Sequence, residues 1–161
     1  MGQQQLLLVI LVTIIVGIAT VVAINTFGAA ADSANLDAVR QDVAQIAAAA
    51  QGYYMKPDML GGGGRSFDGI TFNDIAFAAS GVSADGLTAE NENGRYVLPA
   101  IADGTNAQTF DVTAYPSSGE GYTPSTITDG DITTAGANGS TTGTATVNVN
   151  DATAVSFTGG S

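Results

Sequence analysis

Most of the side chains that carry enzymatic chemistry are missing from this sequence of 161 residues. It contains no His and no Cys, and its four basic residues stand against 15 acidic ones. This composition excludes an imidazole general base, a thiolate nucleophile, a Cys/His zinc site and a disulfide. Four cations are also too few to neutralise the phosphates of a nucleic acid. We therefore expect a non-catalytic protein with no cofactor, no metal and no nucleic-acid partner.

Carboxylates and glycines are the remaining candidates for chemistry. Two carboxylates at the right separation hydrolyse glycosides, but no motif in the sequence brings such a pair together. Asp129, Asp131 and nearby Thr and Asn oxygens have the ligand type of a Ca²⁺ site, yet their spacing matches no calcium loop and favours a turn. Residues 61–64 are glycines followed by Arg65-Ser66. They lack the Lys-Ser/Thr ending of a phosphate-binding loop and predict a flexible connector.

Two patterns leave covalent modification open. Asn138-Gly139-Ser140 fits the acceptor pattern for N-glycosylation, which is short and common by chance. Residues 123–146 are rich in Thr and Ser, which suits either O-linked sugars or a polar surface loop. The candidate glycosylation site is therefore Asn138.

Charge is absent from the first part of the chain. No charged side chain precedes Asp32, although the formal net charge of the sequence is -11. Residues 6–24 form a run in which 14 of 19 are Leu, Ile or Val. As a helix the run would extend about 28 Å, close to the hydrocarbon thickness of a bilayer. A helix that is apolar all round requires lipid or surrounding protein. The residues of this assembly core are Leu6, Leu7, Leu8, Ile10, Leu11, Ile14, Ile15, Gly17, Ile18, Val21, Val22 and Ile24.

Three interpretations of the apolar run are open. A secretory signal peptide begins with basic residues and has a shorter apolar core, whereas residues 3–5 here are Gln, although the three alanines at 29–31 would suit cleavage. A single-pass anchor fits the length but lacks the flanking Lys or Arg that fix orientation. The third interpretation, a helix that bundles with copies of itself, follows from the next segment.

The segment after the run predicts an amphipathic continuation of the helix. Its apolar residues recur at spacings of three and four, which is the pattern of one helix face. Gly28 marks a soft spot, where Asp32 or Ser33 would cap a new helix if the first one broke. Pro57 ends the helix. The stripe expected to dock on a sheet consists of Leu36, Val39, Val43, Ile46 and Tyr53.

Beyond Pro57 the sequence predicts a β-rich head. Asp-Gly pairs recur as turn signals, and apolar and polar residues alternate between them with the period of a half-buried sheet. The Asp-Gly pairs lie at 68–69, 85–86, 103–104 and 129–130. The predicted strands are 95–98, 109–114, 144–149 and 154–158. A short helix is expected at 72–79.

These elements predict an α+β fold with three parts. Residues 1–31 form the apolar membrane or filament-core helix, and residues 32–56 form its amphipathic continuation. Residues 57–161 form an acidic head with a small antiparallel sheet of about four strands, which packs on the second half of the helix.

This layout resembles the type IV pilins and related pilin-like proteins. The apolar run, with Gly-Ile-Ala at 17–19 and Val-Val-Ala-Ile at 21–24, is similar to the membrane and filament-core helix of a pilin. Residues 35–54, ending in two tyrosines, are similar to the amphipathic half that docks on the pilin sheet. The resemblance implies a structural subunit of a cell-surface filament, held in the inner (cytoplasmic) membrane before assembly. It implies as partners other copies of the chain, a prepilin peptidase and the pilus assembly machinery.

Two features depart from the family pattern. A pilin precursor carries a short basic leader that ends in Gly and, soon after it, a glutamate. Here two residues precede Gln3, and the first glutamate is Glu90. Gln5 lies where that glutamate would be if the numbering begins at the mature end, and Leu7 lies there if residue 2 ends the leader. In the family the carboxylate is thought to pair with a neighbour's terminal amine; Gln accepts a hydrogen bond without the charge pairing.

The sequence also carries physical arguments for assembly. The small residues Gly17, Ala19, Ala23 and Gly28 allow helices to approach closely. The acidic head, whose composition resembles that of halophile proteins, would form a solvated sheath, and salt would screen its repulsion, with a Debye length of about 3 Å at 1 M. The alternatives are a minor pseudopilin of a secretion system and a single-pass membrane-anchored binding module. Adhesion, motility and DNA uptake are not distinguished by the sequence.

Overall fold

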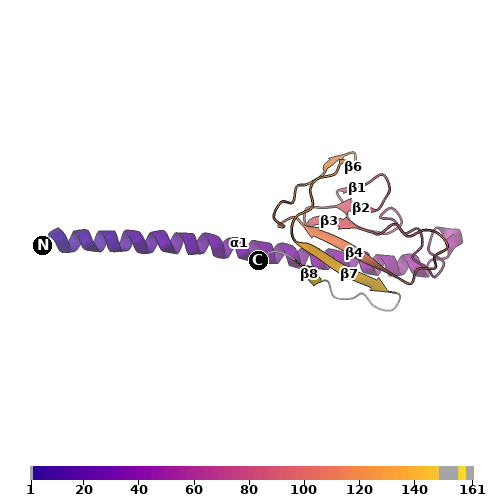
Figure 1. The fold of residues 1–161 in the computed structure, drawn as a ribbon, viewed down its shortest axis with the longest axis horizontal. Coiled ribbons are helices and arrows are strands. Elements are labelled where there is room, and N and C mark those ends of the chain that lie inside the picture. The colour runs from indigo at the N-terminus through magenta and orange to yellow at the C-terminus, as the bar shows by residue number, and fades with distance from the viewer. Residues whose placement is uncertain (1, 149–155, 159–161) are drawn as a thin grey trace. The chain divides into compact units, whose positions relative to one another are not determined.

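The computed structural model describes residues 2–148 and 156–158. This part of the chain has an α+β fold in which a long helix is followed by a 3₁₀ helix and eight strands (Figure 1). The helices are α1 (Gly2–Met55) and η1 (Asp58–Leu60). The strands are β1 (Gly81–Val82), β2 (Thr88–Glu90), β3 (Gly94–Val97), β4 (Thr109–Pro116), β5 (Thr126–Thr128), β6 (Asp131–Thr134), β7 (Thr142–Asn148) and β8 (Ser156–Thr158).

The chain divides into two compact units, Met1–Ala34 and Asn35–Ser161. We call the first unit the N-terminal segment and the second unit the head. The C-terminal part of α1 therefore belongs to the head, together with η1 and all eight described strands. Three predicted features, namely Met1, Val149 and residues 154–155 of the last predicted strand, lie outside the described residues.

Helix α1 passes through Gly28 without a break. The hydroxyl of Ser33 donates a hydrogen bond to the carbonyl of Ala29, one turn back, so Ser33 lies within the helix and caps no new one. The helix ends at Met55, two residues before Pro57. The pyrrolidine ring of a proline cannot continue the i to i−4 ladder, and this explains the stop that the sequence predicts.

The glycines at 61–64 are part of an ordered helix cap, which corrects the flexible connector expected from the sequence. The N–H groups of Gly63 and Gly64 donate hydrogen bonds of 2.9 and 3.0 Å to the carbonyls of Tyr53 and Lys56. These carbonyls lie at the end of α1, where no later turn of the helix supplies a donor. A Cβ on Gly63 would lie 1.8 Å from the carbonyl oxygen of Ser66, so only glycine fits the loop there.

The sheet has the strand order β5-β6-β1-β2-β3-β4-β7-β8. Strands β2, β3 and β4 form an antiparallel meander, and β4 pairs with β7 over six residues, from Thr109 opposite Asn148 to Ala114 opposite Gly143. Along β4 the buried residues Phe110, Val112 and Ala114 alternate with more exposed ones, as predicted. The sheet therefore has one face on the core and one face toward solvent.

The sheet is larger than the sequence predicts, and it is mixed. Strands β1, β2, β5 and β6 were not expected, and β1 pairs with β6 in parallel, Val82 opposite Asp131. All other described strand pairs are antiparallel. These strands have two to four residues, too few to show a period of two. The hairpin β5–β6 turns at Asp129-Gly130, whose φ angles of 54° and 88° are those of a type I′ turn.

The prediction of a short helix at 72–79 is wrong, because this segment is not helical. The N–H of Phe72 donates to the carbonyl of Gly86, and the N–H groups of Phe77 and Ala79 donate to carbonyls two residues back. The Asp74 carboxylate accepts hydrogen bonds from the N–H and the hydroxyl of Thr71, which closes a local turn. An irregular course buries Phe72, Ile75 and, in part, Phe77, at spacings that do not require a helix.

The core of the head lies between the second half of α1 and the sheet. Val39, Val43 and Ile46 on α1 are buried, with Ala47 and Ala50, whereas Leu36 and Tyr53 are half-buried. Figure 1 shows β4 and β7 crossing this part of the helix, with β3 beside β4. Phe67 joins the two layers, because its ring lies 5.2 Å from that of Tyr54 and 5.0 Å from that of Phe110. The remaining core residues are Ile70, Phe72, Ile75, Ala89, Tyr96, Leu98, Val112, Ala114, Ala145 and Val147.

Candidate assembly surface

The apolar side chains of the N-terminal segment are exposed on every side of the helix. Within the assembly core named above, exposure runs from 48% at Ile10 to 66% at Leu7 and Ile24. Phe27, further along, is 76% exposed. Burial of this surface is worth about 25 cal/mol per Å². Exposure of so much apolar surface to water is therefore unfavourable, and the segment requires an apolar environment.

Four hydroxyl side chains of the N-terminal segment are hydrogen-bonded to the backbone of the helix itself. The hydroxyls of Thr13, Thr20 and Thr26 donate hydrogen bonds of 2.6 to 2.9 Å to the carbonyls of the residues four positions earlier. Ser33 does the same. Each hydroxyl donor is thus satisfied within the helix, which lowers the cost of placing it in lipid or against another apolar helix.

At two glycines of the N-terminal segment, no contact within the chain requires glycine. A Cβ added at Gly17 or Gly28 would meet no atom of the chain within 4 Å. Each nevertheless costs the helix about 1 kcal/mol relative to alanine. The free space beside these glycines is therefore open to an external neighbour, such as a second helix.

The first turn of α1 carries no acidic side chain, and Gln5 is exposed. The unpaired N–H groups and the positive dipole end at a helix N-terminus favour a negative charge. The described residues of this chain supply none there. The exposed Gln5 thus presents an amide that can accept a hydrogen bond but carries no charge.

Asp42 fixes α1 to the sheet inside the head. Its Oδ2 accepts hydrogen bonds from the hydroxyl of Tyr96 at 2.6 Å and from the amide groups of Asn91 and Asn93 at 2.9 and 2.8 Å. The Tyr96 side chain is fully buried, and burial together with the Asp42 carboxylate raises its pKa far above the usual value. Asn35 makes a second link, since its amide donates to the carbonyl of Asn93 at 3.0 Å.

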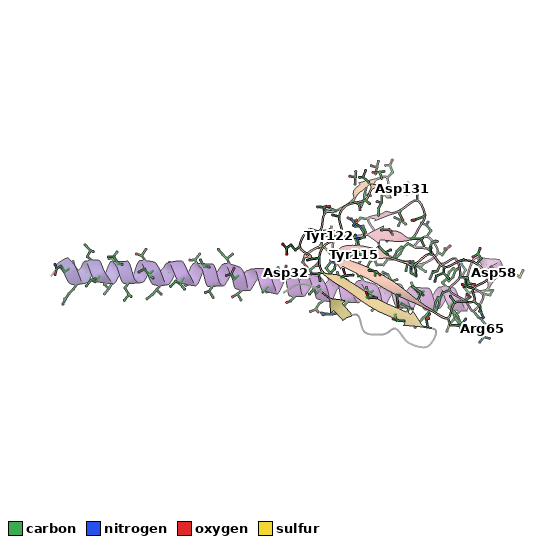
Figure 2. All side chains as sticks on the ribbon, in the orientation of Figure 1. Asp32, Asp58, Arg65, Tyr115, Tyr122 and Asp131 are labelled. Atoms are coloured by element: carbon green, nitrogen blue, oxygen red, sulfur yellow. The ribbon has the colours of Figure 1, made fainter. Side chains whose placement is uncertain are left out.

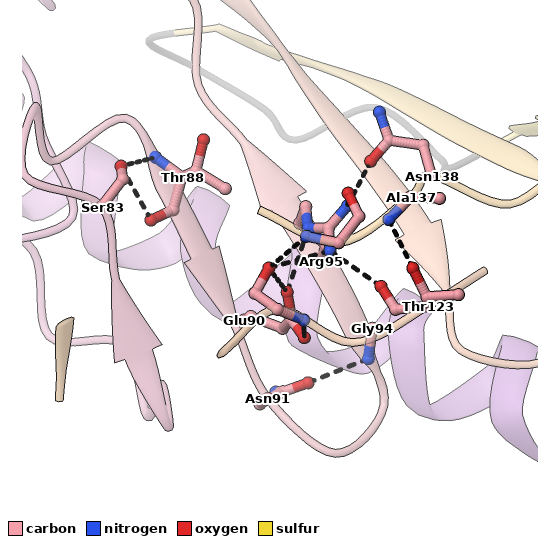
Figure 3. A network of polar contacts seen from close by, with 11 residues as sticks. Ser83, Thr88, Glu90, Asn91, Gly94, Arg95, Thr123, Ala137 and Asn138 are labelled. Atoms are coloured by element: carbon pink, nitrogen blue, oxygen red, sulfur yellow. Dashed lines mark hydrogen bonds and ion pairs between the residues drawn. The ribbon is translucent and has the colours of Figure 1, made fainter. Parts of the chain in front are cut away.

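A buried ion pair forms the centre of a second polar network (Figure 3). Glu90 and Arg95 are 3% and 4% exposed, and Arg95 Nε lies 3.0 Å from Glu90 Oε2. The two carboxylate oxygens also accept hydrogen bonds from the N–H and the hydroxyl of Ser125. Burial alone would raise the pKa of Glu90, but the Ser125 hydrogen bonds and the Arg95 charge hold it below its usual range. The carboxylate is therefore ionised in the folded head.

The Arg95 guanidinium holds the long loop around β5 and β6 against β3. It donates to the carbonyls of Thr123 and Gly136 and, at 2.6 Å, to Oδ1 of Asn138. It also lies 5.4 Å from the centre of the Tyr122 ring. Burial and the Glu90 carboxylate raise the pKa of Tyr122 to about 12. The network satisfies its own donors and acceptors, so its role is to position the loop.

Acidic side chains in the turns of the head include Asp68 and the two residues weighed as Ca²⁺ ligands, Asp129 and Asp131. The Asp68 carboxylate accepts hydrogen bonds from the N–H groups of Asn106 and Ala107 and from the hydroxyl of Thr105. Asp129 and Asp131 belong to the exposed β5–β6 hairpin. Within residues 2–148 and 156–158, no group of three or more acidic side chains is placed to hold a metal ion.

The structure separates the predicted site residues into three groups. The assembly core is exposed on α1, the docking stripe lies in or beside the core of the head, and Asn138 is an exposed residue whose Oδ1 binds Arg95. The sequence analysis missed Asp42 and the Glu90–Arg95 pair. A signal existed for Asp42, because an acid adjoins the buried stripe at Val43. Arg95 is five residues from Glu90, but Ser125, which also binds the Glu90 carboxylate, is 35 residues further on, and no local pattern linked the two.

Comparisons with protein families, with curated proteins and with solved structures found no match. The class of the protein therefore rests on its own fold and surfaces. It is an α+β protein with a long N-terminal helix, and that helix is long and apolar enough to cross a membrane, a property that it shares with signal sequences.

Proposed function

We propose that this chain is a non-catalytic structural subunit of an extracellular pilus-like filament, which polymerises through the N-terminal part of α1. The observation that carries the proposal is the N-terminal segment itself. It is apolar on every side, its hydroxyls are satisfied internally, and Gly17 and Gly28 leave space that no part of this chain fills. A bundle of such helices would bury this surface.

Before assembly, the same helix would lie in a membrane. Its apolar run matches the thickness of a bilayer, so the monomer would wait in the membrane and leave it for the filament core without exposing the helix to water. The acidic head would stay in solvent in both states. Prepilin peptidase and pilus assembly machinery are the partners that this proposal requires.

The first test is to shear surface structures from cells at the salt of their growth medium and to examine them by electron microscopy. Mass spectrometry would identify the subunit and its N-terminal peptide, beginning at Met1 or at Gln3. The proposal expects abundant thin filaments made of this chain. A chain found only in the membrane pellet, without filaments, would instead indicate the single-pass anchored module or the pseudopilin.

A second test changes the helix without changing the head. Val16→Asp or Ile18→Asp places a charge in the apolar bundle, at an insertion cost of about 3 kcal/mol. Filaments should disappear, while a free head from about residue 30, which lacks both positions, should be folded on its own, as its circular dichroism spectrum and a cooperative unfolding transition would show. Intact filaments in either variant would overturn the proposal.

A further inference from the structure

Asn138 is the one asparagine of the sequence that has Ser or Thr two positions later. The Asn-Gly-Ser triplet at 138–140 is an acceptor pattern for N-glycosylation, and the proposed function makes no use of it. The triplet lies between β6 and β7, and Asn138 and Ser140 are both exposed. Because so short a pattern is common by chance, the informative observation is how the fold presents these two side chains.

The fold binds one atom of the Asn138 amide and leaves the other free. Oδ1 accepts a 2.6 Å hydrogen bond from Arg95 Nη1. Nδ2, the atom that carries the sugar in an N-linked glycan, makes no hydrogen bond with the described residues, and in Figure 3 it points away from Arg95. Arg95 is 4% exposed and is itself held by Glu90, so the amide is anchored on a fixed donor. The reacting atom therefore faces outward in one orientation.

The hydroxyl of Ser140 is free as well. The backbone N–H of Ser140 donates a 2.8 Å hydrogen bond to the carbonyl of Glu120, but its hydroxyl makes no hydrogen bond with the described part of the chain. A hydroxyl at this position is what the acceptor pattern requires. Gly139, in contrast, has a packing reason, because a Cβ there would lie 2.9 Å from the backbone of Gly119. The fold thus explains the glycine, whereas the acceptor pattern explains the serine.

The loop around Asn138 is held by hydrogen bonds that a glycan would leave in place. The N–H of Ala137 donates to the hydroxyl of Thr123 at 2.6 Å, and the N–H of Thr123 donates to the carbonyl of Ala137 at 3.0 Å. Thr123 directly follows Tyr122, which is labelled in Figure 2. A sugar on Nδ2 breaks none of these bonds, and it also spares the bond to Arg95, which uses Oδ1. The folded head therefore accommodates a glycan without rearrangement.

We propose that Asn138 carries an N-linked glycan in the mature protein. The donor is an oligosaccharide activated on a lipid diphosphate, and a glycosyltransferase supplies the catalytic base. A bond forms between Nδ2 and the anomeric carbon of the first sugar, and the bond from that carbon to the diphosphate oxygen breaks. The diphosphate leaves with the electron pair, and one amide proton passes to the base. From the proposed function, this inference takes only that the head lies outside the cytoplasm.

Mass spectrometry of the full chain, purified from the cells that produce it, tests the inference. Cleavage on the N-terminal side of Asp131 and Asp151 releases the peptide 131–150. This peptide should be heavier by the mass of an oligosaccharide, and electron-transfer fragmentation should place the added mass on Asn138. The other two asparagines of the peptide lack the acceptor pattern and serve as internal controls. An unmodified peptide, or a glycan on a Ser or Thr hydroxyl, would overturn the inference.

Two substitutions at Ser140 separate recognition by the enzyme from folding. Ser140→Ala removes the acceptor pattern, whereas Ser140→Thr keeps it. Both leave the Asn138 amide on Arg95, and neither removes a side-chain hydrogen bond within the described residues. The added mass should be lost in Ser140→Ala and retained in Ser140→Thr. A glycan that persists in Ser140→Ala would contradict the assignment.

Filament formation is measured separately by electron microscopy of the same cells. An unmodified peptide 131–150 from filaments made of this chain would overturn the glycan and leave the proposed function intact. A glycosylated chain that remains in the membrane pellet, without filaments, would support the glycan and refute the proposed function.

Discussion

The hydroxyl of Tyr96 donates a 2.6 Å hydrogen bond to the carboxylate of Asp42, and this contact joins β3 to α1 in the interior of the head. The two residues are 54 positions apart in the sequence. Asn91 and Asn93 donate to the same oxygen. Three donors from the β2–β3 hairpin therefore bind one acceptor on the helix, which fixes the helix along its axis.

Tyr96→Phe should lower the free energy of unfolding of the head by about 2 kcal/mol, the usual range for a hydrogen bond to a charged group. Asp42→Ala should cost more, because it leaves three donors without their acceptor. Chemical denaturation, followed by far-UV circular dichroism, measures both. If the two changes together cost the sum of the single ones, the two side chains are not coupled and the network has no joint role.

Stability of the head should fall in acid because of Glu90. Its pKa is lowered in the folded state, so its contribution is complete above the ordinary value of 4.5 and is lost as the pH falls through the lower folded value. The midpoint of thermal unfolding, measured from pH 6 to pH 2, should therefore decrease. In Glu90→Gln the protein should be less stable at pH 6, and the pH dependence should be shallower. Parallel curves for the two proteins would contradict the role of the ion pair.

Gly17 should accept a small side chain in the isolated helix but not a large one in the filament. Gly17→Ala removes a helix-destabilising glycine and meets no atom of the chain within 4 Å. Gly17→Leu also fits the single chain, yet it would keep a neighbouring helix from close approach. Filament yield should fall strongly for the leucine variant, while its membrane insertion stays normal in a carbonate extraction. Equal yields would show that no helix packs on Gly17.

Arg65→Gly should test the backbone strain in the loop that follows α1. The change relieves the left-handed strain at φ 75° and adds some entropy to the unfolded chain, so the free energy of unfolding should stay the same or rise by up to about 1 kcal/mol. The side chain that is removed is exposed and forms no ion pair within the described part of the chain, so no stabilising contact is lost, and chemical denaturation measures the change. A marked loss of stability would mean that the Arg65 side chain supports the fold of the head.

The sequence predicted those helices and strands in which apolar residues recur with a regular period over several residues. The stripe that contains Val39, Val43 and Ile46 shows the period of a helix face, and those three residues are buried. Pro57 predicted the end of the helix. In β4, Phe110 and Val112 alternate with polar residues over a strand of eight residues. In each case the repeat spans several residues, so the sequence carries the signal by itself.

The errors arose where contacts are distant in sequence. Strands such as β1, with two residues, have no period of their own and exist because neighbouring strands supply hydrogen-bond partners. Four consecutive glycines predict a flexible segment, but in the fold the N–H groups of two of them donate hydrogen bonds to carbonyls at the end of α1. The segment 72–79 has apolar residues at spacings compatible with a helix, and the irregular course it takes buries them equally well.

The sequence by itself determined the two properties that do not depend on folding partners: an uncharged apolar run long enough to span a bilayer, and an acidic remainder without His or Cys. The tertiary structure decided which polar groups are paired. It joined Asp42 to Tyr96 by a hydrogen bond and buried Glu90 with Arg95 as an ion pair. Lys56 and Arg65, near the end of the helix, form no ion pair within the described part of the chain. The reason is physical: hydrophobicity and net charge are sums over residues, whereas a hydrogen bond or an ion pair requires two groups at one distance, and only the fold sets that distance.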